Sequence, residues 1–229
     1  MARDTHYIAV EATDSIAECF ARRVAATPDA IAYRRFDGSA WKDITWREAD
    51  AAASRVRSGL AAALKQSRPV YMRIGKKGDP LVHTREPEFA IGKSITIQPG
   101  KDVCLISTGV MLPVMVQAAK LLASQGITAR VESFHTVKPL DEQTLSEVFS
   151  GFPLVAVAEE HGRIGGLGGG IAEWLARQER PRARLIAFGT DDAFMHEVGS
   201  TEYARKKFGL TADNIAQQVQ AKLRRVPAR

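Results

Sequence analysis

The 229-residue sequence has little cysteine and no long apolar run. Its two cysteines, Cys19 and Cys104, lie far apart and without metal-ligand spacing, which excludes a disulfide framework and favours buried free thiols. Arg, Lys, Gly or Pro interrupts every apolar stretch before it reaches the roughly 20 residues that a membrane-spanning helix needs. Because the N-terminus leads into no apolar segment, we expect no signal peptide, no membrane contact and a cytoplasmic protein.

The charge pattern does not favour a nucleic-acid partner. Thirty-two basic and 26 acidic side chains leave a net charge of +6, and the basic excess thickens only toward the C-terminus. Aromatic residues make up 7% of the chain and do not alternate with these basic residues, as a nucleic-acid surface would require. We therefore predict a solvated basic helix face and no nucleic-acid partner.

The first 66 residues predict a small α+β appendage. Asp14 is suited to cap a short helix, and Asp37-Gly38 is typical of a turn between two short strands. Thr45 and Glu48 form the pattern of a capping box that begins a second helix, which ends near Lys65. Because so short a segment rarely buries enough apolar surface to fold alone, we expect it to be weakly packed.

Residues 92–229 predict a larger α/β domain, joined to the appendage by residues 67–91. The strand patterns lie at residues 95–97, 103–107, 127–134, 154–158 and 184–188. The first two are typical of a hairpin that is antiparallel at one edge. Helical patterns follow the later strands, two of them capped by Asp141 and Thr211. This alternation indicates a mostly parallel open sheet with helices on both faces.

Three stretches of the appendage carry a family resemblance. They are residues 15–32, Ile44-Thr-Trp-Arg-Glu48 and Ala53-Ser-Arg-Val56. With them, the segment from about residue 13 to residue 64 resembles the N-terminus of an AMP-forming acyl-CoA synthetase. The phosphate loop and adenylate-binding motifs of that family are absent from this sequence, so the resemblance implies no catalytic residue here.

Six motifs recur in order along the rest of the chain. They are Gly100-Lys-Asp-Val103, Ser107-Thr-Gly109, Lys138-Pro-Leu-Asp141, Glu159-Glu-His161, Gly165-Gly-Leu-Gly168 and Gly209-Leu-Thr-Ala-Asp-Asn-Ile215. Together they resemble the C-terminal domain of transketolase and its relatives, the deoxyxylulose-phosphate synthases and the β chains of 2-oxoacid dehydrogenases. The resemblance implies an assembly that uses thiamine diphosphate and Mg²⁺, with no cofactor bound by this chain alone.

Pro69-Val-Tyr-Met-Arg-Ile74 looks like the final strand of the pyrimidine-binding domain that precedes this domain in transketolases. In that family the arginine of this strand helps to hold the sugar phosphate, so the resemblance implies a phosphate-binding role for Arg73. The glutamate that activates the cofactor is absent with the rest of that domain. Taken by itself, an arginine beside Tyr71 is more often an exposed strand residue.

Glu159, Glu160 and His161 follow a predicted strand at the edge where open α/β sheets place their binding residues. Two carboxylates and an imidazole could bind a metal or transfer protons. Neighbouring strand residues point to opposite faces, however, so Glu159 and Glu160 cannot serve one site without a bend. The transketolase resemblance places this motif near a domain interface, and we predict neither a catalytic residue nor a metal site.

A glycine-rich loop, residues 165–170, precedes the next predicted helix. Gly165, Gly166 and Gly168 could present N–H groups to an anion at the helix N-terminus. Because the loop lacks the acidic residue of a dinucleotide-binding fingerprint, close backbone packing is the favoured interpretation. We assign no ligand to the other polar candidates. Turn formation explains Asp191, Asp192 and His196, and no partner can be assigned to His6, His83 or His135.

The residues leave three hypotheses open. The chain could be a transketolase-like C-terminal domain, a structural or accessory part that lacks a complete active site and supports a subunit with the thiamine-diphosphate-binding domains, or that forms a homodimer. It could be a stand-alone module that binds an anion or nucleotide near Glu159, His161 and the glycine loop. It could also be a non-functional fusion of two gene fragments. The junction near Gln66 favours this hypothesis, because it lies inside the missing pyrimidine-binding domain and not at a domain boundary.

Overall fold

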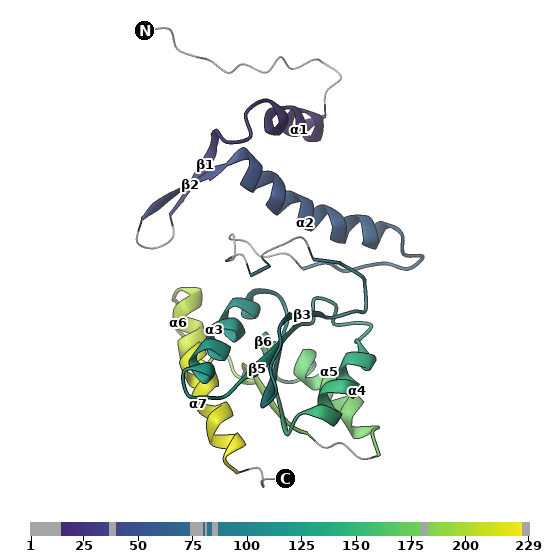
Figure 1. Ribbon diagram of the computed structural model, residues 1–229, viewed down its shortest axis with the longest axis vertical. Helices are drawn as coiled ribbons and strands as arrows, with labels where there is room; N and C mark the ends of the chain where they lie inside the picture. The colour runs from purple at the N-terminus through teal and green to yellow at the C-terminus, as the bar shows by residue number, and fades with distance from the viewer. Residues whose placement is uncertain are drawn as a thin grey trace. The chain divides into compact units, whose positions relative to one another are not determined.

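The computed structural model describes residues 15–36, 40–73, 80, 82–83, 87–179 and 183–225, without the side chains of residues 36 and 55–58. The chain divides into two compact units, Met1–Val70 and Tyr71–Arg229, called here the N-terminal unit and the C-terminal unit. Figure 1 shows the elements of both units, with labels where there is room. No helix in the described ranges combines the length and the apolar composition that crossing a bilayer demands.

The N-terminal unit contains two helices and a hairpin. Helix α1 (Ile16–Ala26) is capped by Ser15 and Glu18, each of whose side chains accepts the other's N–H, so the cap lies one residue after the expected Asp14. Strand β1 (Ile31–Phe36) pairs antiparallel with β2 (Trp41–Thr45), and a capping box of Thr45 and Glu48 begins α2 (Trp46–Leu64). The predicted turn at Asp37-Gly38 lies outside the described residues.

Little of the N-terminal unit is buried. The rings of Phe20 and Trp46 meet edge to face with centroids 5.8 Å apart. Among the residues of this unit whose burial is described, only Gly59 is buried, and Ile16 and Leu64 are 91% and 85% exposed. Because hydrophobic stabilisation follows the apolar area removed from water, weak packing of residues 1–66 stays a prediction for hydrogen exchange to test.

The C-terminal unit is built on a five-stranded sheet of order β3-β5-β4-β6-β7. Its strands are β3 (Ile95–Gln98), β4 (Val103–Ser107), β5 (Ala129–Ser133), β6 (Leu154–Gly162) and β7 (Arg184–Thr190). Four of them run parallel, and β3 is antiparallel at the edge. The predicted mostly parallel sheet is confirmed, and β4 is buried along its whole length because both of its faces are covered.

Two predicted strand features are wrong. β3 does not form a hairpin with β4 but pairs with β5, with Ile95 opposite Ser133. The sequence pattern locates β3, but a pattern of alternating residues does not specify which neighbour the strand chooses. Residues 69–73, expected as the last strand of a pyrimidine-binding domain, form no strand. A strand needs a partner for its backbone hydrogen bonds, and none of the described strands pairs with this segment.

Helices cover both faces of the sheet (Figure 1). The 3₁₀ turn η1 (Gly109–Met111), α3 (Leu112–Ala123) and α7 (Ala212–Leu223) pack on one face, and α4 (Glu142–Gly151) and α5 (Leu167–Ala176) pack on the other. Alternate residues of β4 divide between the two cores, Val103 and Leu105 on the first and Cys104 and Ile106 on the second. Helix α6 (Thr201–Lys207) is not predicted, because none of its residues is buried and it has no apolar stripe.

Candidate functional site

The parallel strands of the C-terminal unit all end at one edge of the sheet, called here the carboxyl edge. The chain leaves β4 for α3 on one face, but it leaves the neighbouring strands β5 and β6 for α4 and α5 on the other. Connections that diverge in this way open a crevice at the strand ends, where α/β sheets bind ligands. Glu159, Glu160 and His161 belong to the end of β6 and therefore lie at this edge.

Glu159 caps helix α5 from the end of β6. Its Oε2 accepts the N–H of Leu167 at 2.7 Å, and its Oε1 accepts the N–H of Gly168 at 2.8 Å. Glu159 is only 3% exposed. A carboxylate in this position satisfies two N–H groups of the first helical turn and interacts favourably with the helix dipole. The N–H groups that the glycine loop offers to an anion are thus accepted by a carboxylate of the chain itself.

The glycine loop allows this carboxylate to approach. A Cβ at Gly166 would lie 2.1 Å from the Glu159 Oε2, and a Cβ at Gly168 would lie 3.1 Å from the Cβ of Ala187 on β7. Gly165 has a φ of +76°, a conformation that favours glycine. The loop therefore serves close packing of α5 against β6 and β7, and an external anion would have to compete with Glu159.

Glu160 points to the opposite face and lies between two arginines. Its Oε1 accepts the Nε–H of Arg205, on α6, at 2.8 Å, and its Oε2 lies 4.0 Å from Nη2 of Arg73. The side chains of Glu160 and Arg205 are 25% and 22% exposed, whereas that of Arg73 is 62% exposed. Strand alternation thus sends Glu159 and Glu160 to different helices, as the sequence predicts. The three residues Glu160, Arg73 and Arg205 are called here the Glu160 cluster.

His161 and the loop after β7 do not join the Glu160 cluster. His161 is exposed, and its Nδ1 lies 3.0 Å from the carbonyl oxygen of the next residue. Asp191 forms an ion pair with Arg163, and Asp192 and His196 are exposed. Across the described ranges, no three His, Cys, Asp or Glu side chains gather where they could hold a metal ion.

Two open grooves flank Arg205. One, of about 490 Å³, has Glu160, Thr190 and Phe208 in its lining, and the other, of about 350 Å³, has Val110 and Thr211 in its lining. Arg205 forms part of both walls. Its ion pair with Glu160 therefore fixes the position of a side chain that shapes both grooves.

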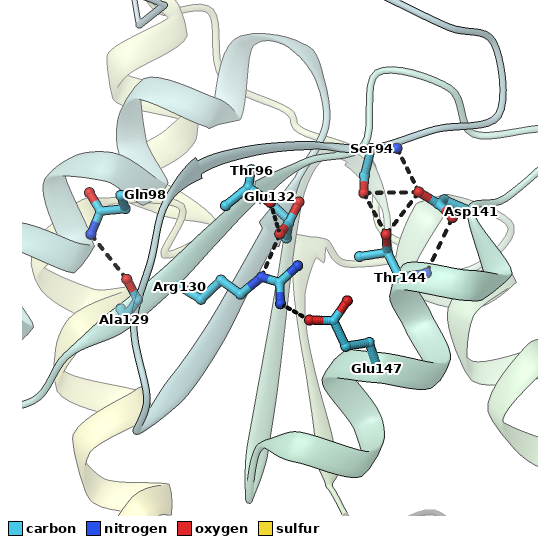
Figure 2. A network of polar contacts seen from close by, with 9 residues as sticks. All are labelled: Ser94, Thr96, Gln98, Ala129, Arg130, Glu132, Asp141, Thr144 and Glu147. Carbon is cyan, nitrogen blue, oxygen red and sulfur yellow. Dashed lines mark hydrogen bonds and ion pairs between the residues drawn. The ribbon is translucent and has the colours of Figure 1, made fainter. Parts of the chain in front are cut away.

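A buried polar network that the sequence patterns do not reveal joins β3, β5 and α4 (Figure 2). Glu132 on β5 is fully buried, and its Oε1 accepts the Thr96 hydroxyl at 2.7 Å and the Nε–H of Arg130 at 2.6 Å. Arg130 also pairs with Glu147 on α4. The other oxygen of Glu132, Oε2, is buried and has no hydrogen-bond partner among the described residues. Strand periodicity cannot predict this burial, because β3 and α4 cover Glu132 only after the sheet has assembled.

Asp141, the predicted cap of α4, also binds the segment that leads into β3 (Figure 2). Its Oδ2 accepts the N–H of Ser94 at 2.8 Å, and its Oδ1 accepts the N–H of Thr144 at 3.2 Å. Burial opposes ionisation of Asp141, but these bonds and those from both hydroxyl groups outweigh burial, so the pKa of Asp141 lies below its ordinary value. The carboxylate therefore fastens the start of β3 to the start of α4.

His135 follows β5 at the carboxyl edge and packs against Phe89, with ring centroids 4.3 Å apart. Its Nδ1 lies 2.9 Å from the Thr136 hydroxyl, and its Nε2 is buried with no hydrogen-bond partner in the described part of the chain. Burial, and secondarily the charge of His83, lowers the pKa of His135, so the imidazole is neutral near pH 7. These contacts make His135 a packing residue. Of the other histidines considered from the sequence, His6 lies outside the described residues.

Comparison with known proteins identifies the same domain that the motifs indicate. A family model described as the transketolase C-terminal domain matches residues 92–215. The 6-deoxy-6-sulfo-D-fructose transketolase subunit of Clostridium sp. (strain MSTE9) is 36% identical over 165 residues, which are 72% of this chain and 50% of that protein. A subunit of the apulose-4-phosphate transketolase of Phocaeicola vulgatus is 29% identical over 166 residues, 72% of this chain and 52% of that protein.

A solved structure described as a split gene transketolase, an inactive beta4 tetramer, shares the fold. It is 34% identical with a TM-score of 0.69, and the similarity covers 76% of this chain and 56% of that one. The chain spans about half the length of the curated relatives it matches. The matched family range contains the carboxyl edge but begins after Arg73.

Proposed function

Because the chain belongs to the transketolase C-terminal-domain family, we propose that it is a structural or accessory part of a thiamine-diphosphate-dependent assembly that transfers ketol groups. The two curated relatives are subunits of transketolases by name, and the chain spans about half of each. In this proposal the chain supplies no reacting group of its own. The domains that bind the cofactor belong to a partner subunit.

An apolar surface at the carboxyl edge carries this proposal. The large apolar side chains that are exposed in the described part of the C-terminal unit are Tyr71, Val137, Ile164, Phe194, Met195, Val198 and Tyr203. All but Tyr71 follow the ends of β5, β6 or β7. Phe194 and Val198 are 92% and 104% exposed. Because the segments that carry these exposed apolar side chains start at the carboxyl edge, this edge fits a contact surface for the partner subunit.

We assign thiamine diphosphate and Mg²⁺ to the partner. The described residues bring no three carboxylate, imidazole or thiol groups together, and the N-terminus of α5 at the glycine loop already holds the Glu159 carboxylate. The residues that the structure describes therefore do not fit a diphosphate or its Mg²⁺ ion. In the assembly the bound cofactor supplies the carbanion chemistry.

The substrate in this proposal is a sugar with a terminal anion. The names of the two relatives specify a sulfo sugar and a sugar phosphate. Arg73 resembles the transketolase arginine that helps to hold the sugar phosphate, and it lies at the carboxyl edge beside Glu160 with 62% of its side chain exposed. We therefore assign Arg73 to the anionic end of the substrate.

We also infer that the N-terminal unit is a fused fragment. The two units divide between Val70 and Tyr71, and residues 13–64 resemble an acyl-CoA synthetase. The free thiols of Cys19 and Cys104 suit a reducing compartment, which supports a cytoplasmic location for the chain.

Because a similar chain is described as a beta4 tetramer, a second copy of this chain, as in a homodimer, is the competing occupant of the apolar edge.

An affinity pull-down tests the partner proposal. The tagged chain is applied to lysate of its native host with thiamine diphosphate and Mg²⁺, and bound proteins are identified by mass. We expect a subunit that carries the diphosphate- and pyrimidine-binding domains. Phe194→Asp should abolish this capture, whereas Ile16→Asp, which adds the same charge at a 91% exposed position of the N-terminal unit, should not. Recovery of the chain alone, as monomer or dimer, would contradict the partner and leave the anion-binding module or the non-functional fusion.

A further inference from the structure

Glu160 shares its carboxylate between guanidinium groups from distant parts of the chain. Arg205, on α6, donates to one oxygen at 2.8 Å, and both side chains of this pair are largely buried. Arg73, which precedes the sheet, approaches the other oxygen at 4.0 Å and keeps most of its surface in solvent. Glu160 is therefore anchored on one side and holds a guanidinium loosely on the other.

Within the Glu160 cluster two guanidinium groups face one carboxylate, so the charges of these three side chains sum to +1. A guanidinium has five N–H donors, and the ion-pair contact shown for Arg73 in the described residues uses one Nη atom. A tetrahedral oxyanion can accept from the remaining donors while the Arg205 pair stays in place. An arginine whose range of orientations an ion pair already restricts loses less conformational freedom when it binds such a ligand.

We propose that Glu160 is a positioning residue: it directs Arg73 toward the terminal oxyanion of the sugar substrate, a phosphate or a sulfonate, and Arg205 fixes Glu160. This inference rests on the proposed function, because it takes Arg73 as the residue that binds the substrate anion. The neighbouring glutamates then have separate tasks. Glu159 holds helix α5, and Glu160 sets the direction of the substrate arginine without touching the substrate.

The first experiment uses the full chain alone. The Nε–Hε cross-peak of Arg73 in ¹⁵N-labelled protein, identified by its loss in Arg73→Lys, reports the surroundings of the guanidinium group. We expect Glu160→Gln to shift this cross-peak and to lower its ¹H–¹⁵N NOE. Glu173→Gln, which makes the same change at an exposed position of α5, should leave it in place. An unchanged Arg73 cross-peak in Glu160→Gln would overturn the inference.

The second experiment uses the chain in its captured assembly and compares ketol transfer from fructose 6-phosphate, 6-deoxy-6-sulfofructose and fructose. Glu160→Gln should raise KM for the anionic donor by up to about fivefold, the upper end of what a partly exposed ion pair provides. Its kcat should stay within about twofold, and KM for fructose should not change. Arg73→Ala should raise the same KM at least about tenfold. Because Glu160 acts through Arg73, the double variant should match Arg73→Ala.

The outcomes separate this inference from the proposed function. Equal increases of KM for anionic and uncharged donors, or additive effects in the double variant, would overturn the positioning role. Which of the two anionic donors responds identifies phosphate or sulfonate as the group that Arg73 binds. Absence of ketol transfer in the wild-type assembly would instead refute the proposed function, and the Arg73 cross-peak would then decide whether Glu160 orients Arg73.

Discussion

Removal of the Glu159 carboxylate is expected to destabilise the C-terminal unit through helix α5. In Glu159→Ala, the N–H groups of Leu167 and Gly168 lose their acceptor at a position where both residues are buried. Each buried N–H group without a partner costs about 1–3 kcal/mol, so the two together cost about 2–6 kcal/mol. A domain is typically stable by about 5–15 kcal/mol, so this loss is a large fraction of the total.

Urea unfolding followed by tryptophan fluorescence measures this loss. Trp174 lies on α5 itself, is 3% exposed and packs against Phe149 with ring centroids 5.7 Å apart. The other two tryptophans, Trp41 and Trp46, belong to the N-terminal unit and are replaced by Phe so that the signal reports α5 alone. With a slope of about 1–3 kcal/mol per molar urea, a loss of about 3 kcal/mol lowers the midpoint by about 1–3 M.

Two variants control the interpretation. Glu173→Gln removes an exposed charge from the same helix and should change stability by no more than about 0.5 kcal/mol. Glu159→Gln keeps one acceptor oxygen and should fall between Glu159→Ala and the wild type. A wild-type midpoint for Glu159→Ala would refute the capping argument. Recovery of its stability in added phosphate would show that the glycine loop accepts an anion once the carboxylate is gone.

Four further measurements follow from the structure. Gly166→Ala places a Cβ 2.1 Å from the Glu159 carboxylate and should lower the free energy of unfolding by about 1–3 kcal/mol. Gly151→Ala, whose Cβ meets no atom within 4 Å, should be neutral or stabilising by about 0.4–1 kcal/mol. Equal urea midpoints for the two variants would contradict the close contact at Gly166. The pKa of Asp141 is depressed in the folded chain, so its contribution to the free energy of unfolding is complete above the unfolded pKa of about 4 and disappears as pH falls through the folded pKa. Asp141→Asn should therefore lose less stability on acidification than the wild type does. Urea unfolding measured over a range of acidic pH values checks this. Burial raises the pKa of the Cys104 thiol, so a thiol reagent at neutral pH should modify only the partly exposed Cys19 in the native chain and both thiols in denaturant. Amide hydrogen exchange should be faster in the N-terminal unit than in β4 and β6, and equal protection would sink the prediction of weak packing.

Features that depend on neighbouring residues are the ones that the sequence predicts well. Thr45 and Asp141 cap their helices because each accepts an N–H three residues on, within the same stretch of chain. The buried strand β4 is a continuous apolar run, and this run together with the helical patterns that alternate with the later strands is enough to predict a mostly parallel sheet. The family-model match confirms the transketolase resemblance, which rests on short motifs of the same local kind.

Contacts between distant residues are the ones that the sequence does not predict. Thr96 and Glu132 are 36 residues apart, and Glu160 and Arg205 are 45 residues apart. Neither pair has a spacing that marks it, because the contact exists only after the strands have taken their order in the sheet. The same limit explains why the prediction pairs β3 with β4. Either β4 or β5 could accept the hydrogen bonds of β3, and only the assembled topology selects β5.

The two adjacent glutamates make β6 intolerant of a change in length. A single-residue deletion between Leu154 and Glu159 would turn each later residue of the strand to the opposite face, so that Glu160 would take the place of Glu159 beside α5 and His161 would take the place of Glu160 beside Arg205. One such deletion would therefore leave Arg205 facing an imidazole instead of a carboxylate, while α5 keeps a carboxylate at its N-terminus. Natural length variation in this domain should therefore fall in the loops on either side of β6 and leave the strand itself at constant length.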